Sequence, residues 1–146
     1  MACPFFYPVE PFDDRRWSPR PQMPLGDPYD GECRAVAGQR PGEQELRNLC
    51  NMGYARGKCP RFQDSCASDA ARFSAASDDG QAITIAWVVE RDHRPAAYGR
   101  LQYSKAAGRF TAPPADEILH RQAAAYVAAY LRRKAAPAAA GGPSRR

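Results

Sequence analysis

Residues 70–104, AARFSAASDDGQAITIAWVVERDHRPAAYGRLQYS, decide the fold of this chain. In the middle of this stretch, apolar side chains alternate with small or polar ones, which is typical of a strand with one buried face. The apolar positions are Ile83, Ile85, Trp87 and Val89. Residues 78–80 (DDG) and 92–95 (DHRP), which flank the alternation, are typical of turns. The stretch therefore predicts a three-stranded antiparallel meander over residues 71–76, 83–90 and 97–103.

A second periodic pattern follows near the C-terminus. Apolar residues recur there every three or four positions, as on one face of a helix, at Leu119, Ala123, Tyr126, Val127, Tyr130 and Leu131. Acidic residues 116–117 begin the segment and basic residues 132–134 end it, which complements the helix dipole. A shorter helix is expected over 43–51, and a cysteine-rich loop over 50–69. Together these patterns predict one α+β domain over 43–134, with the long C-terminal helix packed on the meander.

The first 42 residues have a different composition. Eight of the 14 prolines lie in this segment, which also carries six aromatic residues. Prolines remove backbone donors, whereas disordered segments are poor in aromatics. We therefore expect an irregular, extended strap over 1–42 that docks on the domain through its aromatics. The alternative is a proline-rich ligand for a partner's aromatic groove. Residues 135–146 are predicted to form a disordered basic tail.

Composition and charge limit the classes of function. The 146 residues carry 21 basic and 16 acidic side chains, a net charge of +5. Residues 132–146 hold five of the basic side chains and none of the acidic ones. The preceding residues are therefore neutral and have no net positive field for nucleic acid. The 18 Arg against 3 Lys, with abundant Ala, favour a bacterial origin.

Two kinds of targeting segment are absent from the sequence, which limits where the protein is expected to act. No apolar run reaches the roughly 18 residues that a membrane helix needs, and no secretory signal pattern is present. We therefore expect a cytoplasmic protein with no membrane partner. The sequence also lacks the motifs of phosphate-binding loops, zinc proteases and serine hydrolases, which favours a non-catalytic protein.

The candidate functional residues are cysteines. Four of the five fall within 34 residues, and a chain without a secretory signal is expected to keep its thiols reduced. Four thiolates satisfy one tetrahedral Zn²⁺ ion, at about 2.3 Å each. We predict a structural zinc site formed by Cys33, Cys50, Cys59 and Cys66, with Cys3 as a spare thiol. Such a site would join the strap, the short helix and the loop, where a small core needs support.

The spacing within residues 50–66, CNMGYARGKCPRFQDSC, adds a resemblance. The stretch reads C-x8-C-x6-C, with a Gly-aromatic pair before the second cysteine. It resembles the opening of CCCH-type zinc fingers. The resemblance implies zinc ligation, with RNA binding as the family's role. Ala70 stands where that family has its histidine, and Cys33 takes the place of this ligand in the predicted site.

Two alternatives to zinc stay open. Four cysteines also ligate a [4Fe–4S] cluster, which would give the protein an electron-transfer or redox-sensing role. Cys59-Pro60 and the aromatic residues Tyr54 and Phe62 resemble the segments that wrap such clusters. The thiols could instead be free in the core or form a disulfide, since cysteine is among the most buried residue types.

Basic and aromatic side chains surround the predicted site. They are Tyr54, Arg56, Lys58, Arg61 and Phe62. Such a mixture stacks bases and binds phosphates in proteins that bind single-stranded nucleic acid. It equally offsets the negative charge of four thiolates on Zn²⁺. The sequence thus predicts a small, non-catalytic metal-binding protein that acts as a binding or accessory module for a protein partner. Single-stranded RNA binding is the alternative.

Overall fold

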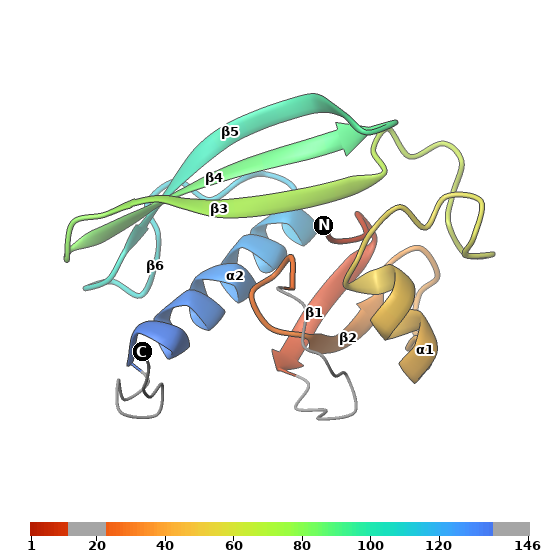
Figure 1. The fold of residues 1–146 in the computed structure, drawn as a ribbon, viewed down its shortest axis with the longest axis horizontal. Helices are drawn as coiled ribbons and strands as arrows, with labels where there is room; N and C mark the ends of the chain where they lie inside the picture. Colours follow the sequence, from red (N-terminus) through yellow and green to blue (C-terminus); the bar gives the residue numbers. More distant parts are fainter. Residues whose placement is uncertain (12–22, 136–146) are drawn as a thin grey trace, which may run out of the picture.

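The computed structural model describes residues 1–11 and 23–135, which form an α+β fold (Figure 1). Four strands form one antiparallel sheet in chain order: β3 (Ala70–Asp78), β4 (Ala82–Arg91), β5 (Arg94–Ser104) and β6 (Arg109–Phe110). A separate antiparallel pair consists of β1 (Phe6–Pro11) and β2 (Tyr29–Cys33). The predicted three-stranded meander is therefore part of a larger sheet, which β6 extends beside β5.

The two turns of the meander follow the local chemistry of the sequence. In the first, the Asp78 carboxylate accepts a hydrogen bond from the Gly80 N–H at 3.0 Å, and Gly80 adopts a φ of +91°. In the second, Asp92 and His93 form a two-residue loop between β4 and β5, with φ values of +54° and +63°. Two consecutive positive φ angles match the twist of the flanking strands. Both predicted turns are confirmed.

The prediction of an irregular strap over 1–42 is wrong for the residues of β1 and β2. Pro8 and Pro11 lie within β1, and the register between the two strands shifts between Pro8 and Glu10. A two-stranded pair tolerates these prolines because each strand has one open edge, where no backbone donor is needed. Two of the aromatics assigned to the strap, Phe12 and Trp17, lie outside the described residues. Of the tail predicted over 135–146, Ala135 belongs to the C-terminal helix and residues 136–146 lie outside the described residues.

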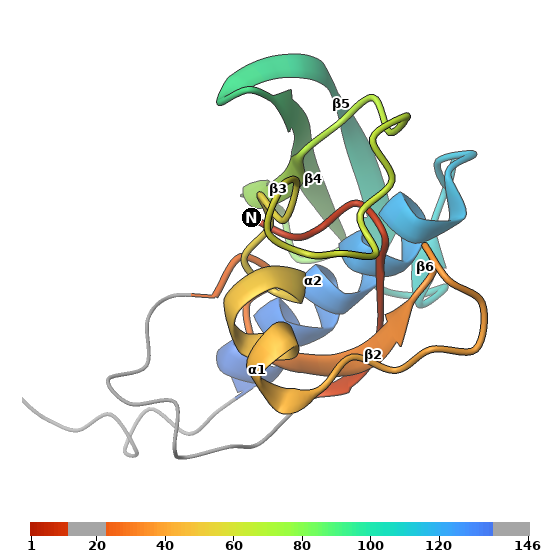
Figure 2. The ribbon, with the colours of Figure 1, turned by 90° about the vertical axis from the view of Figure 1, so that its right-hand side faces the viewer.

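The long helix α2 (Glu117–Ala135) lies between the two sheets in both views (Figures 1 and 2). Asp116 caps its start, since one carboxylate oxygen accepts hydrogen bonds from the N–H groups of Ile118 and Leu119 at 2.9 Å each. The expected short helix is present as α1 (Glu43–Glu45), which continues as a π-helical turn, η1 (Leu46–Cys50). No helix within the described ranges has the length and apolar character needed to cross a bilayer.

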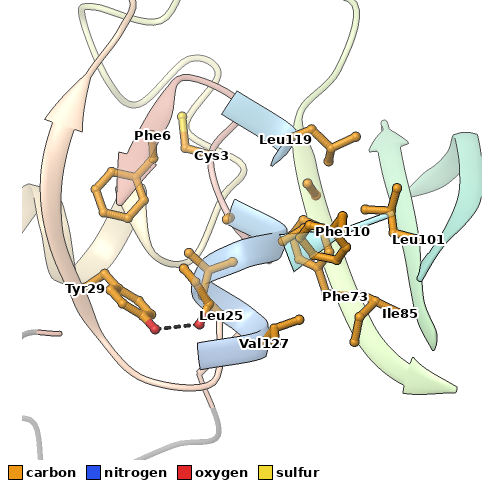
Figure 3. Close-up of a cluster of buried hydrophobic side chains, with 14 of the residues drawn as sticks. Cys3, Phe6, Leu25, Tyr29, Phe73, Ile85, Leu101, Phe110, Leu119 and Val127 are labelled. Carbon is orange, nitrogen blue, oxygen red and sulfur yellow. Dashed lines mark hydrogen bonds between the residues drawn. The ribbon is translucent and has the colours of Figure 1, made fainter. Parts of the chain in front are cut away.

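Both sheets bury their inner faces against α2 (Figure 3). The largest apolar side chains that are fully buried come from both sheets, the helix and the segment before β2: Phe6, Leu25, Ile83, Ile85 and Val127. Tyr29 fixes β2 to the helix, because its hydroxyl donates to the Ala125 carbonyl at 2.6 Å (Figure 3). The β1–β2 pair is thus an integral layer of the fold, and it brings the N-terminal residues to the helix.

Candidate metal centre

Four cysteine side chains line one cavity of about 20 Å³. They are Cys3, Cys33, Cys50 and Cys59. They come from the N-terminal residues, the end of β2, the end of η1 and the loop that follows it. In Figure 2 the α1–η1 helix, β2 and this loop lie on the same side of α2. The fold thus gathers thiols from segments that are far apart in the chain.

Backbone hydrogen bonds place all four of these cysteines, since the Cys33 N–H also donates to the Gln39 carbonyl at 3.2 Å. The Cys3 N–H donates to the Cys50 carbonyl at 3.0 Å, and the Cys59 N–H donates to the Ala55 carbonyl at 2.8 Å. Cys33 is the last residue of β2 and lies opposite Phe6 in the β1–β2 register. The strand pair therefore links the positions of Cys3 and Cys33, because β1 begins three residues after Cys3.

A buried asparagine connects η1 to β2 and so relates Cys50 to Cys33. Asn51 is 1% exposed. Its side-chain oxygen accepts the Tyr29 N–H at 3.0 Å, while its NH₂ group donates to the carbonyls of Tyr29 at 3.0 Å and Leu46 at 2.9 Å. The Asn51 N–H also donates to the Leu46 carbonyl, the i→i+5 bond of the π-helical turn. Such turns are frequent at functional sites, and this one ends at a lining thiol.

The rest of the cavity wall is apolar, with one exception. The other lining residues are Phe5, Phe6, Ala35, Leu49, Ala55, Arg61 and Phe62. The rings of Phe5 and Phe62 meet edge to face, with centroids 5.1 Å apart. Arg61 is the only charged residue in this lining. The wall therefore offers few polar partners to a water molecule beside the thiols.

Burial sets the protonation state of two of the thiols. It raises the pKa of Cys3 to about 12 and also raises the pKa of Cys50. The neighbouring thiols of Cys33 and Cys59 add to both shifts because deprotonated sulfurs would repel one another. Both groups are protonated at neutral pH when no metal is bound. A metal would therefore have to displace their protons, which makes binding pH-dependent.

Cys66, one of the four ligands predicted from the sequence, lies outside this lining. Its sulfur is 3.7 Å from the Ser68 hydroxyl, and its charge influences the pKa of Cys3, so it is a neighbour of the site. Cys3, which the sequence predicts to be a spare thiol, lines the cavity instead. All five cysteines are free, and Cys3 is the buried one, while the other four are half-buried. Within the described residues, no three Cys, His, Asp or Glu side chains are grouped closely enough to hold a metal ion as they stand.

A repeated pattern could have identified Cys3. The sequence carries Cys-Pro-x-Phe twice, at residues 3–6 (CPFF) and 59–62 (CPRF). The cysteine that begins each pattern lines the cavity, and so does the phenylalanine that ends it. Counting cysteines within a short window favoured Cys66, whereas comparing their local sequences would have paired Cys3 with Cys59.

Four of the five residues of the predicted binding surface make side-chain contacts within the chain: Tyr54, Arg56, Arg61 and Phe62. Arg56 forms an ion pair with Asp69 at 2.6 Å, and its terminal nitrogens donate to loop carbonyls. Tyr54 stacks on His93, with ring centroids 4.2 Å apart, and donates its hydroxyl proton to Glu90 at 2.6 Å. Phe62 and Arg61 line the thiol cavity.

Lys58 is the one member of that set with an exposed side chain. The other four are half-buried and serve the internal structure of the loop. Tyr54 connects the cysteine-rich loop to the β4–β5 turn, because it stacks on His93 and donates a hydrogen bond to Glu90. These contacts leave little of the predicted surface available to stack bases.

Comparison of the chain with family models, curated proteins and solved structures finds no match.

Proposed function

We propose that this chain is a metal-binding protein whose centre is held by Cys3, Cys33, Cys50 and Cys59. One observation carries the proposal: these four thiols, from four separate segments, line the same cavity. Four cysteine ligands are a standard set for a structural zinc site. The ligand set differs from the sequence prediction only in that Cys3 replaces Cys66.

Zn²⁺ is the occupant that the dimensions favour. A cavity of this kind needs roughly 10–15 Å³ to hold one water, so about 20 Å³ leaves room for one small atom between the walls. Ligation requires the thiol side chains to turn toward a common centre and lose their protons. Zinc thiolate bonds of about 2.3 Å would then draw the four segments together.

An iron–sulfur cluster is the second candidate, and the character of the walls favours it. The Phe5 and Phe62 rings and the Leu49 side chain give an apolar surround, and the exposure of a cluster to solvent is one determinant of its potential. A [4Fe–4S] core is much larger than one ion, so these rings would have to move outward. In this case the role would be electron transfer or redox sensing.

The zinc form of the proposal describes a non-catalytic binding or accessory module. The ion would fix the N-terminal residues, the end of β2 and loop 51–69, whose outer surface would then be presented to a protein partner. The free state of all five cysteines is consistent with a reducing compartment such as the cytoplasm. The internal partners of Tyr54 and Arg56 argue against RNA binding as the main role.

Metal analysis of single variants tests the proposal. The wild-type protein, purified without oxygen, is expected to carry one equivalent of zinc, measured by native mass spectrometry and elemental analysis. Cys3→Ser, Cys33→Ser, Cys50→Ser and Cys59→Ser should each lose most of the metal, whereas the matched Cys66→Ser variant should retain it.

Each other outcome has a definite meaning. Metal loss in Cys66→Ser with retention in Cys3→Ser would overturn this ligand set and restore the one predicted from the sequence. Iron with inorganic sulfide, and a brown colour, would replace zinc with a cluster. A wild-type protein that binds neither zinc nor iron with these thiols would refute the metal centre.

A further inference from the structure

The sheet of β3 to β6 has one covered face and one open face. Side chains alternate between the two faces of a strand, and α2 packs against the face that carries Ile83 and Ile85 (Figure 1). The opposite face carries the alternate residues, which the strand registers place in rows: Arg72, Val88 and Tyr98 in one row, Ser74, Ala86 and Arg100 in the next, and Ser104 beside Arg109. All of these residues are exposed or half-buried, so no described helix or strand covers this open face.

Tyr98 is the most exposed large apolar side chain among the described residues. It is 79% exposed, whereas the next, Val9, is 39% exposed. Its side chain makes no hydrogen bond or ring contact with any other described residue. Its neighbours on the open face are small, with Val88 directly opposite and Ala86 on the diagonal. The ring is therefore available as a platform on which a planar group can stack.

The charges at the open face are positive. Arg100 and Arg109 are exposed and form no ion pair within the part of the chain that the structure describes. Among the strand positions on this face, Glu90 is the one carboxylate, and it is only 6% exposed. It accepts hydrogen bonds from the Arg72 Nε at 3.0 Å and the Tyr54 hydroxyl at 2.6 Å. Although residues 1–131 are neutral in sum, the open face thus offers unpaired cations and no exposed carboxylate.

The middle of the open face distinguishes between two kinds of partner. The core of a protein interface is apolar and is rich in large side chains. Here the residues between Tyr98 and the β3 edge are small or polar, such as Ser74, Thr84 and Ala86. A flat surface with one exposed ring and separate arginines instead matches single-stranded nucleic acid, whose bases stack on aromatic rings and whose phosphates bind cations.

We propose that the open face of the β3–β6 sheet binds single-stranded nucleic acid, with one base stacked on Tyr98 and backbone phosphates bound by Arg100 and Arg109. Sheets that present exposed aromatics to unpaired bases are a common means of recognising single strands. This surface is separate from the cysteine-rich loop and does not depend on the thiol cavity. Failure of the proposal would therefore leave the proposed metal centre intact.

Fluorescence anisotropy with a fluorescein-labelled oligouridylate of about ten nucleotides tests the proposal, since this length lies within the usual range of single-strand sites. Tyr98→Ala should weaken binding about 5- to 150-fold, which corresponds to the loss of one stacked base. Tyr98→Phe keeps the ring and should bind like wild type. Arg100→Gln should weaken binding and reduce the slope of log affinity against log salt by about 0.7, the value for one phosphate contact on a single strand. Arg40→Gln is the matched control, because Arg40 is exposed, pairs with Asp30 and lies in the loop after β2.

Oligothymidylate and duplex RNA of the same length complete the test. Tighter binding of the uridylate would identify RNA as the ligand, whereas equal binding would assign the face to single strands of either kind. The proposal would be overturned by a wild-type protein that binds neither single strand, or by wild-type affinity in Tyr98→Ala or in Arg100→Gln. Duplex RNA that binds as tightly as the single strand would exclude the stacked base. Dimers that form without nucleic acid and dissociate in Tyr98→Ala, measured by sedimentation, would replace the nucleic acid with a second copy of the chain.

Discussion

Gln122 connects the long helix to the thiol cavity, and its replacement gives the sharpest test of how the fold positions Cys3. The residue lies in α2 and is 1% exposed. Its NH₂ group donates to the Cys3 carbonyl at 2.8 Å and to the Phe6 carbonyl at 2.7 Å. Gln122→Leu keeps most of the volume of the side chain and removes both donors. The substitution thus isolates the hydrogen bonds from the packing.

The expected loss of stability follows from what each carbonyl retains. The Cys3 carbonyl still accepts the Phe6 N–H at 3.0 Å, so its loss is close to the net value of one hydrogen bond, about 1 kcal/mol. The Phe6 carbonyl loses a buried donor, which costs about 1–3 kcal/mol. The sum is about 2–4 kcal/mol. With a urea dependence of about 2 kcal/mol/M, in the middle of the range for a small protein, the unfolding midpoint should fall by about 1–2 M.

Urea unfolding of the metal-free protein measures this change, followed by circular dichroism. Gln102→Leu is the matched control, because Gln102 is exposed on β5 and surface substitutions stay within about 0.5 kcal/mol. Gln122→Leu should also weaken metal binding, since the segment that carries Cys3 loses its attachment to α2. If Gln122→Leu unfolds at the same midpoint as Gln102→Leu, the two hydrogen bonds do not hold the N-terminal segment and the reasoning fails.

Three further predictions concern the rest of the fold. A Cβ at position 99 would lie 2.7 Å from the Trp87 ring, so Gly99→Ala should lower the free energy of unfolding by about 1–3 kcal/mol; an unchanged urea midpoint would contradict this packing. The hydrogen bond from Tyr54 is the largest cause that holds the pKa of Glu90 below its usual 4.5, so the charged form favours the folded state. Its contribution is complete above pH 4.5 and is lost as the pH falls through the lowered value. The stability advantage of wild type over Glu90→Gln should therefore shrink on acidification, and an advantage that is constant between pH 6 and about 3 would refute the assignment. The Tyr29 hydroxyl donates to a carbonyl of α2 at 2.6 Å, so Tyr29→Phe should cost about 1–2 kcal/mol in the same urea assay, and an unchanged midpoint would exclude that bond as a stabilising contact.

The elements that could be predicted from the sequence are those with local causes. The alternation around Ile85 and the turn chemistry of residues 78–80 are each encoded within a few residues. The helical periodicity of apolar residues in α2 is also a local feature, and its cap at Asp116 lies one residue before the helix begins. The β3–β4–β5 meander and the helix were therefore predictable, because no distant contact is needed to specify them.

The β1–β2 pair and β6 could not be predicted in this way. Prolines within β1 indicate an irregular segment to any local rule, and only the open edge of a two-stranded pair makes them tolerable. β6 consists of two residues, Arg109 and Phe110, and exists because the chain returns beside Tyr103 and Ser104. Such pairings depend on which segments the rest of the fold brings side by side.

In the candidate site, too, some features have local causes in the sequence and others depend on distant contacts. The sequence predicts a site made of cysteines, and three of the four predicted ligands line the cavity. Cys3, the fourth ligand in our proposal, could not be chosen by proximity in sequence, because it is held by Gln122 of α2 and by Cys50, both far along the chain. The ion pair of Arg56 with Asp69 could not be predicted either, because no local pattern in the sequence indicates it.

The position of the cavity explains what a metal would add to this fold. The fully buried apolar side chains of the meander, such as Ile83 and Ile85, pack on the α2 side of the molecule. The apolar lining of the cavity ranges from the fully buried Phe6 and Ala55 to Phe5, Leu49 and Phe62, which are partly buried and pack against the same core. Because metal binding contributes to folding free energy where its ligands converge, a four-cysteine centre would add stability at the junction of the N-terminal residues, β2 and the loop. Its effect should accordingly be local to that junction, and the meander would keep its structure from its own packing.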